Sequence, residues 1–430
     1  MVINKNAYSK NVNICYATDY QRSFSMNKKK IYKWCNKYIN ASNLKMTILL
    51  IPLAILLIRG IQEGEYKLSS FLDVSILVSF LLIFVCEVLA NIISSVITAK
   101  CEDAVKLTED YGRLNRKYSR ENLIKYNGET FPEICLAFRK EKEPPFRLNL
   151  EVDTKYPVYE LPKQIADHSK ELMEAHSHSI IYNNTNVRLN DCQQNGSEVE
   201  LRYGKTTYFD SLITNRAMDY PIAGKSIREI YEPGPFLSSL AESKMSNHLG
   251  FNGFVELAEG KIIFVHRTAN VSIGKNTLAT SIGASYKAVY GLDEKRRITR
   301  KTMANAIRME IKDELKINIP EEIPLEESIF AFYRDIVEGG KPQFLFYVKL
   351  PYLTDVAFEE EFIKQMKDKG QKTQDHRKVV TDGTHFKYFM LEQLKEFSYQ
   401  PDGMKDSDGI MYKMMPSSVV SVVLLLKYKA

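Results

Sequence analysis

The sequence predicts a membrane-anchored α/β protein, in which a helical transmembrane hairpin is followed by a long soluble body. Three observations lead to this fold class. Two apolar segments lie close together within residues 44–98. Beyond residue 146, strand-like and helix-like stretches alternate, which is typical of α/β domains. The chain of 430 residues is also too long for one ordinary domain, so two or three units are expected.

The first apolar segment covers residues 46–58 and is thirteen residues long. A helix that crosses a bilayer needs roughly 20 residues. The flanking Lys45 and Arg59 can extend their charged ends toward water. With both included, the segment runs from Leu44 to Ile61 and reaches eighteen residues, which is enough for one span.

The second apolar segment covers residues 71–98 and is interrupted by Asp73, Glu87 and Asn91. The stretch between the two segments, residues 59–70, is too short for a domain, so the two spans would form a hairpin. The alternative is a pair of buried core helices, because neither segment is both long and free of charge. A secretory signal peptide fits poorly after 45 polar residues with no cleavage site.

Positive charge lies on both outer sides of the hairpin, and the basic N-terminal segment is residues 1–43. The residues are Lys28, Lys29, Lys30, Lys33, Lys37 and Lys45 before it, and Lys100, Lys106, Arg113, Arg116, Lys117 and Arg120 after it. By the positive-inside rule both ends face the cytoplasm. The six scattered cysteines contain no Cys-x-x-Cys pair and agree with a reducing compartment.

Glu87 and Asn91 share one face of the predicted second span with other small or polar residues. An acid in the middle of a bilayer costs about 2.5–3.5 kcal/mol on insertion scales. The stripe therefore indicates a helix contact in a homo-oligomer or a wet pathway. An acid that simply reaches water at the cytoplasmic end is the equal alternative.

Residues 99–145 are predicted to form a helical stalk or linker. Leu107, Tyr111, Leu114 and Tyr118 are spaced by 4, 3 and 4 residues, as on one face of a helix. Two adjacent prolines at 144 and 145 then mark the boundary with the soluble body.

The soluble body is predicted as an N-terminal extension, residues 146–250, and a domain, residues 251–430. Gly339 and Gly340 separate two strongly β-like runs, which indicates a hairpin. Helices are expected at 161–176, 301–316 and 356–369, a buried apolar element at 419–426, and strands at 198–203, 252–257, 261–266, 277–289, 328–336, 343–350 and 385–390.

Composition excludes several classes of protein. The chain is 44% hydrophobic and 26% charged, with a net charge of +6. This mildly basic balance suits an anionic ligand or an anionic membrane surface, but not duplex DNA. The sequence contains no phosphate-binding P-loop, dinucleotide glycine fingerprint, zinc-protease His-Glu-x-x-His or hydrolase nucleophile elbow.

The most informative stretch is the predicted helix that ends near residue 317. Glu310, Asp313 and Glu314 are spaced i, i+3 and i+4, so their carboxylates emerge on one helical face. Three neighbouring anions repel one another unless a divalent cation or a cationic ligand lies among them. The alternative is a solvated acidic helix surface.

With the strands around it, this helix resembles the signature box of Nudix domains, which ends in Arg-Glu-U-x-Glu-Glu-x-Gly-U, where U is aliphatic. Glu310, Asp313 and Glu314 occupy the three cation-binding positions, for which the resemblance implies Mg²⁺. Lys301 stands in place of the upstream glutamate, Met309 in place of the arginine, and Lys316 in place of the glycine near the end of the box. The resemblance covers roughly residues 250–395 and implies an α/β/α Nudix-like domain with a mixed sheet.

A membrane hairpin joined to a divergent Nudix domain resembles the two-transmembrane Nudix effectors of bacterial CBASS anti-phage systems. That resemblance implies an inner-membrane, multi-pass protein with its soluble domain in the cytoplasm. Its expected partners are a cyclic oligonucleotide second messenger, membrane lipids and other copies of the chain, with no DNA.

Three functions remain open from the sequence. The first is an effector that senses a cyclic oligonucleotide through a degenerate, non-catalytic Nudix domain and disrupts the membrane. The second is a membrane-tethered Mg²⁺-dependent hydrolase of nucleoside diphosphate derivatives, with Glu310 and Glu314 as catalytic residues. The third is a membrane-anchored scaffold that binds only protein.

Candidate ligand contacts come from the strands and loops around the acidic helix. Aromatic rings can stack on bases, and cations can bind phosphates. The candidates are Phe332, Tyr333, Phe346 and Tyr347 for stacking, and Arg267, Lys287 and Arg334 for phosphate. Core packing is the alternative for the aromatic residues, because side chains alternate between the two faces of a strand.

Overall fold

The computed structural model describes residues 107–174, 176, 183–267, 274, 276–372 and 383–430. The chain divides into two compact units, Met1–Ala104 and Val105–Ala430, and all of the described residues belong to the second unit. The predicted basic segment, residues 1–43, and the predicted hairpin, residues 44–98, lie outside the described residues.

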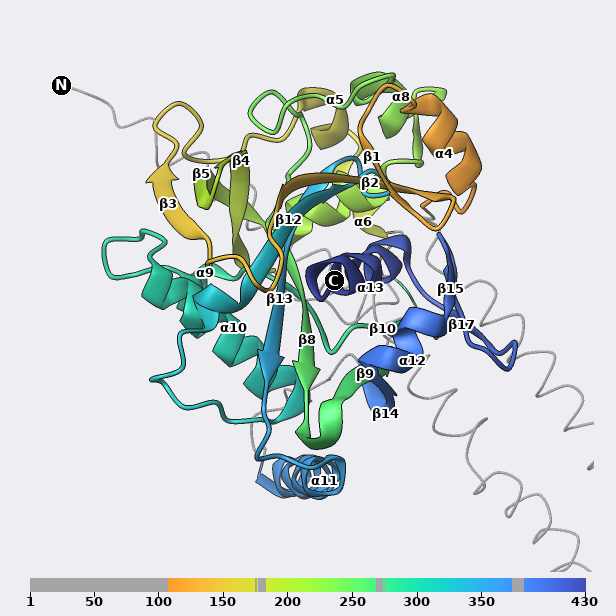
Figure 1. Ribbon diagram of the computed structural model, residues 1–430. Coiled ribbons are helices and arrows are strands. Elements are labelled where there is room, and N and C mark those ends of the chain that lie inside the picture. The colour runs from red at the N-terminus through yellow and green to blue at the C-terminus, as the bar shows by residue number, and fades with distance from the viewer. Residues whose placement is uncertain (1–106, 175, 177–182, 268–273, 275, 373–382) are drawn as a thin grey trace, which may run out of the picture. The chain divides into compact units, whose positions relative to one another are not determined.

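A mixed sheet of nine strands forms the centre of the described unit (Figure 1). Strand β8 runs parallel to β13, whereas the other pairs in this sheet are antiparallel. The strand order is β1 (Leu123–Tyr126), β2 (Glu129–Phe138), β12 (Ile329–Asp335), β13 (Lys341–Lys349), β8 (Gly250–Glu256), β9 (Lys261–Arg267) and β10 (Leu278–Ala279), with β11 (Ile282–Ser285) beside β8 and β14 (Gly383–Met390) beside β9.

Helices α10 (Arg300–Leu315) and α13 (Pro416–Tyr428) lie on opposite sides of the sheet (Figure 1). Successive residues of a strand point to opposite faces. Phe332 accordingly packs with Ile307 and Ile311 of α10, whereas Tyr333 packs with Val419 of α13. The sheet is therefore buried on both faces.

Helix α10 carries the acidic residues and has clear start and stop signals. Thr299 caps its N-terminus by accepting a hydrogen bond from the Thr302 main-chain N–H, and Lys316 ends it in the left-handed conformation at φ 61°. Met303, Ile307 and Ile311 recur every four residues on its buried face.

The N-terminal extension forms a second, three-stranded sheet with short helices. Its strands are β3 (Arg147–Val152), β5 (Glu198–Thr207) and β4 (Thr185–Asn195), in that order. Around them are α4 (Tyr111–Lys117), α5 (Lys163–Ala166), α6 (Ser169–Glu174), α7 (Tyr208–Leu212), the 3₁₀ turn η2 (Asn215–Ala217), the pair β6 (Pro221–Ile222) and β7 (Lys225–Ser226), and α8 (Ile227–Tyr231).

The remaining elements complete the edges of the unit. They are η3 (Ala258–Gly260), α9 (Ala288–Gly291), η4 (Leu325–Ser328), α11 (Asp355–Lys372), α12 (Leu391–Glu396) and a small sheet of β15 (Ser398–Gln400), β16 (Gly403–Lys405) and β17 (Met411–Lys413).

Strand β4 joins the extension to the main sheet. Asn186 forms an antiparallel bridge with Lys287, and Arg188 forms one with His248. Between these bridges the Val187 N–H donates to the Tyr286 oxygen at 3.0 Å, and the Val187 oxygen accepts from the Leu249 N–H at 2.8 Å. The start of β4 thus continues the hydrogen bonding of β8 and β11.

The predicted fold class requires correction. The structure shows a mixed-sheet α/β domain, and none of the helices within the described residues is long and apolar enough to span a membrane. The apolar helix α13 has 13 residues. At 1.5 Å per residue it rises about 20 Å, which is less than a hydrocarbon core of about 30 Å.

The prediction of a helical stalk over residues 99–145 is also wrong for its described part. Within residues 107–122 the α-helix is α4, with seven residues, and residues 123–138 then form the β1–β2 hairpin of the main sheet. Asn127 and Gly128 both have positive φ between these strands. This Asn-Gly pair is a strong hairpin-turn signal that the helical spacing of the preceding apolar residues obscured.

Most of the expected elements in the soluble body are confirmed. They include the helix that carries the acids, the β12–β13 hairpin around the double glycine, and the buried apolar element at 419–426, which lies within α13. The expected helix over 161–176 is present as the two short helices α5 and α6.

We predict that Gly253→Ala destabilises the domain. A Cβ at Gly253 would lie 2.0 Å from Cζ of Phe346, so the buried ring would have to move. Overpacking of this kind costs about 1–3 kcal/mol in free energy of unfolding. The matched control is Gly283→Ala on the adjacent strand, where the nearest atom to an added Cβ is 3.5 Å away. Equal unfolding free energies for the two variants in denaturant titrations would contradict the packing of this core.

Candidate functional site

The acidic helix places Glu310 inside the protein, where Lys287 neutralises it. The Glu310 side chain is 1% exposed, and its Oε1 lies 2.5 Å from Nζ of Lys287. Lys287 lies two residues after the end of β11 and occupies the N-cap position of α9. A buried carboxylate is tolerated when it is paired with a cation, so this ion pair holds α10 against the end of β11.

The other two acids of the box are more open to solvent. Asp313 is exposed and Glu314 is half-buried. Within the described part of the chain, no group of three or more histidine, cysteine, aspartate or glutamate side chains could hold a metal ion. Of the three acids, the buried Glu310 is the one that is paired with an ammonium group, that of Lys287.

The predicted stacking aromatics are core residues. Phe332 and Phe346 are fully buried in the core beside α10, and Tyr333 and Tyr347 are buried in the core beside α13. The hydroxyl of Tyr333 accepts a hydrogen bond from Asn252 Nδ2 at 2.5 Å. Of the two interpretations of these rings, the structure favours core packing.

The predicted phosphate-binding cations have separate roles in the structure. Arg334 is buried and donates from Nε to the Gly340 oxygen and from Nη1 to the Ser238 oxygen, each at 2.9 Å. Burial lowers the pKa of Arg334. Arg267 is half-buried at the end of β9, and an added Cβ at Gly283 would lie 4.0 Å from its Nη1. Two of the predicted site residues, Lys287 and Glu310, are brought together in the structure as an ion pair.

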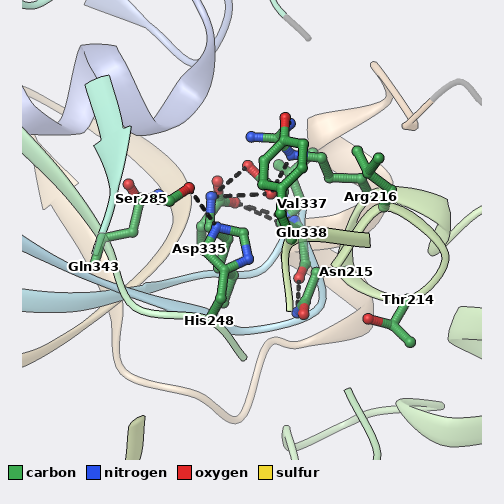
Figure 2. A network of polar contacts seen from close by, with 12 residues as sticks. Thr214, Asn215, Arg216, His248, Ser285, Asp335, Val337, Glu338 and Gln343 are labelled. Carbon is green, nitrogen blue, oxygen red and sulfur yellow. Dashed lines mark hydrogen bonds and ion pairs between the residues drawn. The ribbon is translucent and has the colours of Figure 1, made fainter. Parts of the chain in front are cut away.

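A buried ionic cluster that sequence analysis missed lies at the turn between β12 and β13 (Figure 2). Glu338 Oε2 lies 3.2 Å from Lys341 Nζ and 3.5 Å from Arg216 Nε. The Lys341 and Glu338 side chains are 6% and 5% exposed. Asp335 is also buried and accepts hydrogen bonds from the Val337 N–H at 2.8 Å and the Glu338 N–H at 3.3 Å.

The extension encloses this turn with hydrogen bonds to its main chain. Arg228 of α8 donates to the oxygens of Ile336 and Val337, each at 2.7 Å. Asn215 of η2 donates to the Glu338 oxygen at 2.8 Å. These bonds satisfy carbonyl groups that a buried turn would otherwise leave unpaired, so the cluster connects the extension to the sheet.

Two carboxyl groups face each other beside the cluster. Glu133 on β2 pairs in register with Asp335 on β12. Neither carboxyl oxygen of Glu133 forms a hydrogen bond with any described residue. Burial and then the charge of Asp335 raise the pKa of Glu133 well above its usual value. Burial and then Glu338 raise the pKa of Asp335 to about 7, against the opposing effect of Lys341.

His248 lies beside the cluster, next to Ser285 (Figure 2). Its Nε2 is 3.1 Å from Oγ of Ser285, and its Nδ1 is buried without a hydrogen bond to any described residue. Burial, together with the nearby Lys341 and Arg216, lowers the pKa of His248 well below its usual value, so the ring is neutral. Ser285 and His248 resemble a nucleophile–base pair, but no described carboxylate orients the ring through Nδ1, as a catalytic triad requires.

One sequence signal could have located the cluster. Asp335, Glu338 and Lys341 are charged residues around a double glycine between two apolar strands. This pattern locates the turn, but a hairpin turn normally exposes such charges, so the pattern does not indicate their burial. Arg216 and His248 come from distant segments, and their approach depends on the fold of the extension.

Comparisons with known proteins do not identify the family. No family model matches the chain, and no curated protein matches it. A similar solved structure is the crystal structure of DR0079 from Deinococcus radiodurans, at 14% sequence identity and a TM-score of 0.19. The match covers 34% of this chain and 69% of that chain. A likeness of this strength carries no argument about fold or function.

We predict that the stability of the domain depends on the ionisation of Asp335. Its carboxyl pKa rises from 3.8 to about 7 on folding, so between these pH values the folded protein holds a proton that the unfolded chain releases. The contribution is fully present below the lower value and is lost as pH rises through about 7. Asp335→Asn, which keeps an acceptor oxygen, should reduce the fall in unfolding free energy by roughly 1–3 kcal/mol.

Urea titrations from pH 4 to pH 8 measure this change. Asp167→Asn, at an exposed position, is the control. An Asp335→Asn profile that follows the wild-type curve across this range would show that Asp335 is not the group that titrates.

Proposed function

We propose that the described α/β domain binds a phosphate-linked nucleotide of the cyclic oligonucleotide class, and that it is a sensor and not a Nudix-type hydrolase. The observation that carries this proposal is the Lys287–Glu310 ion pair, with 2.5 Å between Nζ and Oε1. In this arrangement a lysine supplies the positive charge that a divalent metal would supply in a hydrolytic box.

Electrostatics favours this exchange of metal for lysine. Two like charges about 4 Å apart repel by several kcal/mol at the effective dielectric of a partly buried site. A Mg²⁺ ion bound to Glu310 would therefore have to displace the ammonium group. The sequence also departs from the Nudix signature at two framework positions of the box, where Lys301 and Met309 replace the usual glutamate and arginine. These replacements likewise favour a non-hydrolytic site.

The position of Lys287 suits a phosphate ligand. Its side chain is 27% exposed, in contrast to the buried Glu310, so part of the side chain is open to a ligand from solvent. Ser285, two residues earlier, is also half-exposed. The net charge of +6 adds a weak long-range attraction for anions.

The resemblance to CBASS effectors motivates the choice of a cyclic oligonucleotide. The role in anti-phage defence, the disruption of a membrane, the inner-membrane location and the homo-oligomer stay predictions from the sequence. Each depends on residues 1–106, which lie outside the described part of the chain.

We predict that the full chain binds cyclic di- or trinucleotides in the presence of EDTA, with Lys287→Met weakening the affinity about tenfold. The expected loss reflects one charge-assisted contact, since a change of 1.4 kcal/mol is tenfold in affinity. Isothermal titration with a panel of cyclic nucleotides measures the affinity. The control is Lys301→Met, which removes an exposed lysine of α10.

The competing hydrolase is tested in the same preparation. The sensor account expects no enzyme-like Mg²⁺-dependent turnover of ADP-ribose or nucleoside diphosphate sugars. Efficient turnover that is abolished by Glu314→Gln would establish the hydrolase and reject the sensor.

A further inference from the structure

The junction between β4 and the main sheet brings together polar side chains from four segments. We call the set of Asn186, Tyr208, His248, Ser285 and Lys287 the junction site. Asn186 bridges Lys287 across the junction, and directly bridged residues of antiparallel strands place their side chains on the same face. The bridge between Arg188 and His248, two residues along β4, puts His248 on this face as well.

Two buried members of the junction site have unused hydrogen-bonding atoms. Asn186 is 1% exposed, and neither its amide oxygen nor its amide nitrogen bonds to any described residue. His248 is fully buried, with Nδ1 unbonded among the described residues. Most buried polar groups in proteins are hydrogen-bonded, so two such side chains at one place need an explanation.

Two other polar side chains near Asn186 have hydrogen-bond partners. Thr206, directly opposite Asn186 on β5, lies 2.8 Å from the hydroxyl of Ser246. Asn190, four residues along β4, is also 1% exposed, but its amide nitrogen donates to Asp153 at 2.8 Å and to the Tyr156 oxygen at 3.1 Å. Arg188, between Asn186 and Asn190, also keeps a buried Nε without a hydrogen bond to any described residue, whereas Asn186 has no bond from either amide atom.

The other members of the junction site form a more open side. Ser285, Lys287 and Tyr208 are half-buried. The Tyr208 ring lies 6.3 Å from the His248 ring, and the Arg216 guanidinium lies 5.3 Å from the Tyr208 ring. The site thus combines an aromatic surface and a cation with two buried polar groups.

We propose that the junction site holds an adenine base of the nucleotide ligand, with its edge on Asn186 and His248 and the adjoining phosphate at Lys287. This inference rests on the proposed function. An asparagine amide offers a donor beside an acceptor, which matches the amino group and ring nitrogen of adenine. The neutral His248 ring suits an uncharged base edge, and Tyr208 offers a face for stacking.

Asn186 and Asn190 provide a matched test because they are equally buried asparagines of one strand. If the Asn186 amide is unsatisfied in the ligand-free protein, Asn186→Leu removes a buried polar group that has no partner. The melting temperature should then stay the same or rise by about 2–4 °C. Asn190→Leu breaks existing hydrogen bonds and should lower it by a similar amount.

Binding is measured on the full chain by isothermal titration with cyclic di-AMP, and with cyclic di-GMP for comparison. We expect Asn186→Leu to weaken cyclic di-AMP binding at least about tenfold, which is the value of one good hydrogen-bonding pair. Asn186→Ala gives the same comparison if the leucine variant is not recovered.

The possible results distinguish a failure of the junction site from a failure of the sensor proposal. Unchanged cyclic di-AMP affinity in Asn186→Leu, or a fall in its melting temperature like that of Asn190→Leu, overturns the junction site and leaves the sensor proposal standing. Tighter binding of cyclic di-GMP overturns the assignment to adenine. A wild-type chain that binds no cyclic nucleotide overturns the sensor proposal and the ligand assigned to this site together.

Discussion

The ion pair between Lys287 and Glu310 is the contact on which the functional part of the structure depends. It fixes the acidic helix α10 to the end of β11, and it leaves one carboxylate of the box inside the protein with its charge neutralised. Removing Lys287 would leave Glu310 as a buried, uncompensated charge, which is destabilising. Lys287 also bridges Asn186 in register, so one residue links the helix, the sheet and the extension.

The extension and the sheet share a second polar contact at the β12–β13 turn. Arg228 and Asn215 bind main-chain oxygens of the turn, while Arg216 and Lys341 neutralise Glu338. Buried networks of this kind are costly unless their members are satisfied, and they specify a single arrangement of the surrounding elements. Together with the β4 junction, this contact explains why residues from 105 onward form one compact unit.

The sequence predicts the helices and strands better than it predicts which segments pack against them. Helix α10 and the β12–β13 hairpin carry strong local signals, namely a four-residue apolar spacing and a double glycine. Such signals do not say which face another segment covers. From the sequence, the rings of Phe332 and Phe346 are candidates both for ligand contact and for core packing, and the structure places them in the core. Lys287 was predicted as a phosphate contact, but its pairing with Glu310 depends on two segments 23 residues apart.

The candidate site was also incomplete because its new members come from the extension. Asn186 and His248 are unremarkable in the sequence, and only the pairing of β4 with the ends of β8 and β11 places them beside Lys287. The charged turn at Asp335 and Glu338 was overlooked because hairpin turns are usually exposed. Its burial follows from long-range contacts with α8 and η2, which no local pattern indicates.

We infer that the ammonium group of Lys287 occupies the place of a metal ion at Glu310. Mn²⁺ titration of the EDTA-washed full chain, followed by electron paramagnetic resonance, tests this claim most directly. The account predicts that Glu310→Gln leaves the Mn²⁺ binding of the wild type unchanged, and that Lys287→Met creates a Mn²⁺ site that Glu310→Gln then removes. A wild-type Mn²⁺ site that disappears in Glu310→Gln would contradict the account.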